Sequence, residues 1–119
     1  MKINTHEVLK AANTKWNFVN YKPGLVGGHC IAIDPYYLTY KARKVGVDPK
    51  LILSGQKINN YIPLHIAKRV LKKIDLKKKI KKSILILGLT FKEDCSDLRD
   101  SKVFNIIDSL KKKNCKIDY

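Results

Sequence analysis

Residues 27–30 read Gly-Gly-His-Cys, and an Asp-Pro pair follows at Asp34. Consecutive glycines let a backbone approach a ligand closely and point its N–H groups toward it. A cysteine directly after such a turn has the exposure and the nearby amide dipoles that a nucleophilic thiol needs. Two other interpretations stay open: Cys30 is a small buried apolar residue, and Asp34 caps a helix whose first residue is Pro35.

A second set of reactive side chains lies in residues 88–101, which read Gly-Leu-Thr-Phe-Lys-Glu-Asp-Cys-Ser-Asp-Leu-Arg-Asp-Ser. This stretch follows an apolar run and precedes a helical pattern, and the carboxyl end of a parallel strand is where nucleotides bind in doubly wound sheets. Lys92 and Arg99 can neutralise phosphate, and Phe91 can stack on a base. An ordinary charged loop is the alternative. The stretch contains no GxGxxG, so it does not predict the usual cradle for a dinucleotide.

The elements around this second set form a β-α-β pattern. Residues 83–89 are a continuous apolar run, as expected for a strand buried on both faces of a parallel sheet. A helix with apolar residues at the i, i+3, i+4 and i+7 positions is predicted after Ser101, and a second strand over 115–119. The sequence therefore predicts the opening unit of an α/β domain.

The first part of the chain predicts helices. We expect a short capped helix over 4–13, a second helix over 34–46 and a long third helix over 48–74. Pro63 lies inside the third helix, and the missing N–H should kink or divide it near 60–62.

These patterns predict three regions. Residues 1–76 form a helical domain with a candidate nucleophile loop over 20–34, residues 77–82 a lysine-rich linker, and residues 83–119 the start of an α/β domain. Two parallel strands cannot bury both of their faces, so we expect the second domain to be truncated.

Composition limits the classes of function. The chain has 119 residues, 25 of them basic and 10 acidic, which gives a net charge of +15. Base readers and phosphate clamps favour arginine, but the arginines are limited to Arg43, Arg69 and Arg99. A solvated lysine face is therefore favoured over a small nucleic-acid-binding module, which stays an alternative. No apolar run reaches the length of a membrane span.

The three cysteines, Cys30, Cys95 and Cys115, form no CxxC pair and no spacing suited to zinc, so no metal is expected. Their odd number favours reduced thiols in a cytoplasmic protein. A further alternative is an inactive interaction fragment whose apolar helix face needs a partner. The residues that would supply that face are Val8, Leu9, Ile58, Ile62 and Ile66.

Taken together, segments 22–38, 58–60 and 88–101 resemble the UDP-glucose/GDP-mannose dehydrogenase family, the nucleotide-sugar 6-dehydrogenases. Residues 22–38 resemble the nucleophile loop that ends the family's central helical domain. The Ile-Asn-Asn of 58–60 resembles part of its long connecting helix, and 88–101 resembles the opening of its UDP-binding domain. The sequence Lys-Pro-Gly-Leu-Val-Gly-Gly-His-Cys at 22–30 is most similar to the branch that acts on UDP-N-acetylhexosamines, including dehydrogenases of Vi polysaccharide biosynthesis.

The resemblance implies an NAD-dependent oxidation of a UDP-sugar C6 alcohol to the carboxylate, in the biosynthesis of a surface polysaccharide or capsule. It implies that Cys30 forms a thiohemiacetal and then a thioester, and that Asp34 orients or activates the water that hydrolyses the thioester. Arg99 is implied to reach the cofactor. The implied substrate contacts come from Asn20, Tyr21, Gly24, Gly28, Phe91 and Lys92.

The resemblance covers a fragment of the family's length. The NAD-binding Rossmann domain and the start of the central domain, with its catalytic lysine and asparagine, have no counterpart in these residues. Residues 14–17 hold no arginine where relatives place one that reaches a partner's active site. We therefore expect the isolated chain to be inactive. We also expect it to form a homodimer through the helical domain, or to associate with a separately encoded N-terminal half.

Overall fold

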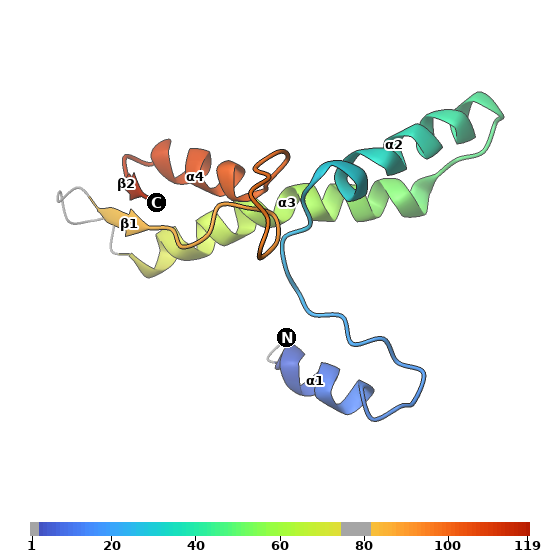
Figure 1. The fold of residues 1–119 in the computed structure, drawn as a ribbon, viewed down its shortest axis with the longest axis horizontal. Helices are drawn as coiled ribbons and strands as arrows, with labels where there is room; N and C mark the ends of the chain where they lie inside the picture. Colours follow the sequence, from blue (N-terminus) through green and yellow to red (C-terminus); the bar gives the residue numbers. More distant parts are fainter. Residues whose placement is uncertain (1–2, 75–81) are drawn as a thin grey trace.

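The computed structural model of the protein describes residues 3–74 and 82–119. Three helices come first and a strand-helix-strand unit follows (Figure 1). In chain order the elements are α1 (Thr5–Ala12), α2 (His29–Lys44), α3 (Lys50–Lys73), β1 (Ser83–Leu85), α4 (Val103–Lys111) and β2 (Lys116–Asp118).

The long helix α3 is the element against which the others pack. Helix α2 lies along its first half and α4 along its second half (Figure 1). Ala67 of α3 meets Ile106 and Leu110 of α4 in a buried cluster that also contains Cys115. Because half-buried residues of the two strands pack on the same cluster, the end of α3 covers one side of the small sheet.

The β-α-β prediction is confirmed. Strands β1 and β2 are parallel, with Ile84 opposite Ile117, and α4 connects them. The first strand is shorter than expected and ends at Leu85. Leu87, which the apolar run placed in the strand, is 86% exposed. Each strand has one hydrogen-bonded neighbour, so β1 is paired only over the residues that lie opposite β2, Ser83–Leu85.

Helix α2 begins five residues before the expected cap. Gly28 is the residue before its first turn, and its φ of 83° lets the chain enter the helix at His29. Asp34 and Pro35 therefore lie inside the helix, and the interpretation of Asp34 as a helix cap is wrong. The loop expected over 20–34 ends at Gly28.

Helix α3 is continuous from Lys50 to Lys73, so the expected division near 60–62 does not occur. Pro63 lies inside the helix and is among the most buried side chains. Its ring removes one helical hydrogen bond but packs in the interior, and tertiary packing outweighs the lost bond.

Helix α1 has the predicted cap. The side chain of Asn4 accepts a hydrogen bond from the N–H of His6 at 3.0 Å and donates one to Glu7 at 3.1 Å. An extended segment connects α1 to α2 and holds it apart from the other elements (Figure 1). The predicted lysine-rich linker lies outside the described residues except for Lys82. Among the helices of the described ranges, none has the length and apolar character needed to cross a bilayer.

Candidate functional site

Cys30 is the second residue of α2, two residues after Gly28, and is exposed. Asp34 lies four residues later, which places both side chains on one face of the helix. The two residues line the same apolar groove of about 470 Å³, together with Ile31, Pro35, Leu38 and Ile52. A thiol and a carboxylate thus share a groove that is large enough for part of a ligand.

The glycine pair is packed against the second candidate segment. A Cβ on Gly27 would lie 2.7 Å from the carbonyl oxygen of Asp100, and one on Gly28 would lie 2.9 Å from the ring of Phe91. Both glycines are buried. The fold therefore brings residues 27–30 and residues 91–101 into contact, although they come from different ends of the sequence.

A hydrogen bond closes residues 89–101 into a compact loop. The buried hydroxyl of Ser101 donates to the carbonyl oxygen of Leu89 at 2.6 Å and accepts from the N–H of Val103 at 3.4 Å. The Nζ of Lys92 lies 5.6 Å from the centre of the Phe91 ring. The loop thus presents an aromatic ring and an ammonium group side by side, which suits a nucleotide base and its phosphates.

Arg99 is held by Asp97. Its Nε and Nη2 donate to the Asp97 carboxylate at 3.0 and 2.7 Å, and its backbone N–H donates to the same group at 2.9 Å. These bonds lower the pKa of Asp97 from 3.8 to about 2, with a smaller contribution from the charge of His29. The hydrogen bonds and the charge of Asp97 raise the pKa of Arg99 in turn. The backbone of Asp100, the next residue, contacts Gly27, so this ion pair belongs to the loop that packs against the start of α2.

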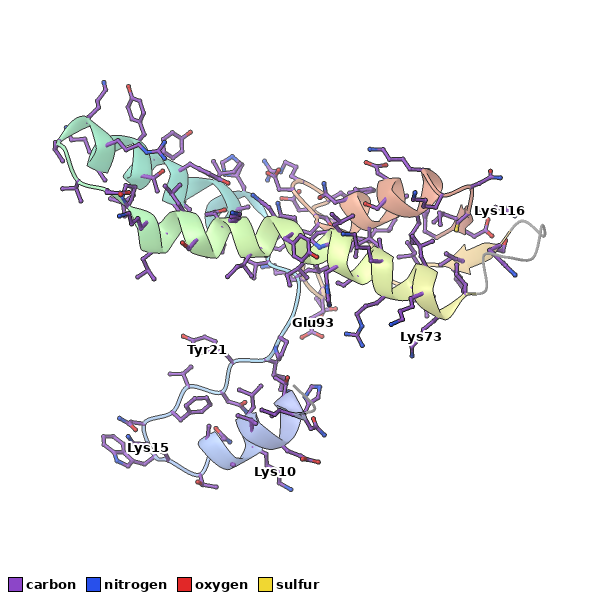
Figure 2. All side chains as sticks on the ribbon, turned by 180° about the vertical axis from the view of Figure 1, so that it is seen from behind. Lys10, Lys15, Tyr21, Lys73, Glu93 and Lys116 are labelled. Atoms are coloured by element: carbon purple, nitrogen blue, oxygen red, sulfur yellow. The ribbon has the colours of Figure 1, made fainter. Side chains whose placement is uncertain are left out.

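Two predicted substrate residues, Asn20 and Tyr21, are not brought to this site. Tyr21 lies on the extended segment next to α1, apart from α2 and α3 (Figure 2). Asn20 lines a small pocket of about 200 Å³ with residues of α1. Gly24 has open space around it. The predicted residues that the structure does bring together are Gly28, Cys30, Asp34, Phe91, Lys92 and Arg99.

Two asparagines of α3 join these segments, and neither was predicted as a site residue. The side chain of Asn59 binds both backbone groups of Val26. Asn60 accepts from Lys102 Nζ at 2.9 Å and donates to the hydroxyl of Tyr36 at 3.3 Å. Two adjacent amides in a long helix are the sequence signal, but the partners lie too far along the chain to be inferred from it.

Curated proteins similar to this chain include dehydrogenases of nucleotide sugars. The chain is 54% identical to Protein CapL of Staphylococcus aureus over 93% of its own length, and 47% identical to the UDP-N-acetyl-D-glucosamine 6-dehydrogenase of Pseudomonas aeruginosa over 99%. It spans 27% and 28% of those two relatives. The chain is therefore similar to about a quarter of each curated relative.

The solved structures that superpose on this chain include dehydrogenases of UDP-sugars. The UDP-D-ManNAc dehydrogenase of Pyrococcus horikoshii superposes with a TM-score of 0.79 at 29% identity, over 97% of this chain and 28% of that one. The UDP-N-acetyl-mannosamine dehydrogenase Cap5O of S. aureus superposes with a TM-score of 0.70 at 32% identity, over 97% and 26%. The family model for the central domain matches residues 1–61, and the model for the UDP binding domain matches 85–119. This chain belongs to the UDP-glucose/GDP-mannose dehydrogenase family.

Proposed function

We propose that the chain supplies the reactive thiol and the uridine-diphosphate contacts of an NAD-dependent UDP-N-acetylhexosamine 6-dehydrogenase of capsule biosynthesis. The observation that supports this most is the contact of Gly28 with Phe91. That contact puts a thiol at a helix start next to a loop with an aromatic ring and two cations. The relatives named above, three of which are dehydrogenases of UDP-N-acetylhexosamines, suggest the substrate class.

The proposed role of Cys30 is to retain the aldehyde formed by the first oxidation. The thiolate adds to the carbonyl carbon and forms a C–S bond, while the C=O π bond breaks and its electron pair moves to oxygen, which gives the thiohemiacetal as its alkoxide. Loss of hydride from that carbon leaves a thioester, and attack by water breaks the C–S bond and releases the carboxylate and the thiol. Asp34, on the same helix face, is proposed to accept a proton from that water.

NAD⁺, when bound, supplies the hydride acceptor for both oxidations. The residues present fit part of such a cofactor: the side chain of Arg99 is 72% exposed, so an anionic phosphate can reach it. Lys92 is exposed as well and is proposed to bind the phosphates of the UDP-sugar, while Phe91 contacts its base.

The test transplants residues 1–119 into the P. aeruginosa relative in place of the aligned segment. With UDP-N-acetyl-D-glucosamine, the chimera should form two NADH per sugar, and the Cys30→Ala chimera should form no carboxylate. A folded chimera whose Cys30→Ala variant still makes the carboxylate would overturn the proposal. The isolated chain should bind UDP but give no NADH, and the Lys92→Ala variant should bind UDP more weakly.

We further propose that the helical part is a dimer interface, as the exposed apolar side chains of α2 and α3 suggest. Tyr37 is 70% exposed, Leu51 88% and Ile58 62%. The face expected from the sequence is divided, since Val8 and Ile58 are exposed but Ile66 packs on the core. Light scattering tests this, because a strict monomer at high concentration would contradict it.

A further inference from the structure

The side-chain amide of Asn59 forms two hydrogen bonds with the backbone of the segment that precedes Cys30. Its Nδ2 donates to the carbonyl oxygen of Val26 at 2.8 Å, and its Oδ1 accepts from the N–H of Val26 at 3.3 Å. Val26 lies in an irregular stretch, so these bonds take the place that a strand partner would have. A primary amide offers a donor and an acceptor side by side, which a carboxylate or a hydroxyl group cannot do in the same way.

Little freedom remains between Val26 and the thiol. Gly27 lies against the backbone of Asp100, and Gly28 lies under the ring of Phe91 with a φ of 83°. Helix α2 then begins at His29. Asn59 also lines the groove of about 270 Å³ that holds Ile31 and Pro35 of α2. The amide therefore holds the near end of a short, packed segment whose far end carries Cys30.

We propose that Asn59 is a positioning residue, whose bonds to Val26 set the placement of the Cys30 thiol against the 89–101 loop. This role rests on the proposed function only for the catalytic role of the thiol. The placement of the thiol can be measured without substrate. Asn60 provides the contrast, since it has the same side chain on the same helix but binds Lys102 and Tyr36, six residues beyond Cys30 on α2, instead of the backbone that precedes the thiol.

The experiment measures alkylation of Cys30 in the full chain with iodoacetate and with iodoacetamide at low ionic strength, followed by peptide mapping. Asp34 on α2 and the ion pair of Asp97 and Arg99 on the facing loop set the local charge around Cys30. Arg99 is the cation among these groups, so moving the thiol away from the loop should lower its preference for the anionic reagent. The rate ratio at Cys95 in the same molecule corrects for the overall charge of +15. A few ångströms of displacement from a single cation changes such a ratio by roughly threefold.

In the Asn59→Leu variant we expect the corrected ratio at Cys30 to fall about threefold, while the Asn60→Leu variant keeps the wild-type ratio. Asn59→Gln, which keeps the amide, should recover part of the preference. The Arg99→Gln variant should lower the ratio in the wild-type background and have no further effect when Asn59 is Leu. An unchanged ratio in Asn59→Leu, or an equal fall in both asparagine variants, would overturn the proposal.

The buried Cys115 reports on the integrity of the fold in each variant, because it is labelled only when the core opens. If Asn59→Leu exposes Cys115, the Asn59→Ser variant takes its place, and the corrected alkylation ratio at Cys30 is expected to fall in that variant. No step uses a UDP-sugar or NAD⁺. A changed ratio with an inactive chimera would therefore refute the proposed function alone, and an unchanged ratio with an active chimera would refute the positioning role alone.

Discussion

The ring of Phe91 lies directly on the backbone of Gly28, so that a Cβ on this glycine would be 2.9 Å from the Cε2 atom of the ring. The contact joins the start of α2, which carries the thiol, to the loop that follows β1. Two segments with separate chemistry thereby become one site.

Replacing Gly28 by alanine should weaken this junction. The φ of 83° is strained for any residue with a side chain, and the added methyl group meets the aromatic ring. We expect a loss of about 1–3 kcal/mol in the free energy of unfolding, measured by urea denaturation. Gly24→Ala is the matched control, since nothing lies within 4 Å of that position, and it should leave stability nearly unchanged. Equal stabilities of the two variants would contradict the contact.

The order of thiol reactivity follows from exposure. Cys30 is exposed, Cys95 is partly covered and Cys115 is buried in the core. Iodoacetamide at neutral pH should therefore label Cys30 several-fold faster than Cys95, with Cys115 slowest. Peptide mass mapping after partial alkylation gives the order. If Cys95 or Cys115 reacts first in the folded chain, the first turn of α2 is not formed as described.

The sequence predicted the elements of the chain better than their junctions. The β-α-β unit was evident because an apolar run, a helical period and a second apolar run are local patterns. The start of α2 was not, because Asp34 and Pro35 are typical of a first helical turn and concealed the entry at His29. A glycine with positive φ can begin a helix without a side-chain cap, which sequence patterns do not reveal.

The contacts that assemble the site are long-range. Cys30, Phe91 and Lys92 were proposed from the types of their side chains and from the family resemblance, whereas the bond of Asn59 to Val26 depends on how α3 packs. For Asn20 and Tyr21 the resemblance implied contacts with the sugar, but this structure places both residues near α1 (Figure 2).

The shared core under the small sheet predicts a large effect of one leucine. Leu110 of α4 is 1% exposed and packs with Ala67 of α3. Leu110→Ala should lower the free energy of unfolding by about 2–5 kcal/mol, because it removes apolar burial and leaves a cavity. Leu87→Ala, at a position 86% exposed, should change it by less than about 0.5 kcal/mol. Similar midpoints for the two variants in urea would show that α3 and α4 do not share a core.

The ion pair of Asp97 and Arg99 predicts a specific dependence on pH. The pKa of Asp97 is about 2 in the folded chain against an ordinary value of 3.8, so the native state binds this proton less readily than the unfolded state. The stabilisation from this group is therefore fully present above about pH 4 and is lost as the pH falls toward about 2. In the Arg99→Gln variant, the carboxyl carbon of Asp97 followed by NMR should titrate at a higher pH than in the wild type but still below 3.8, because the backbone N–H of residue 99 keeps its bond to the carboxylate. The Arg69→Gln variant removes the same charge from α3 and should leave the low midpoint in place. A midpoint near 3.8 in the wild-type chain would mean that the pair does not form.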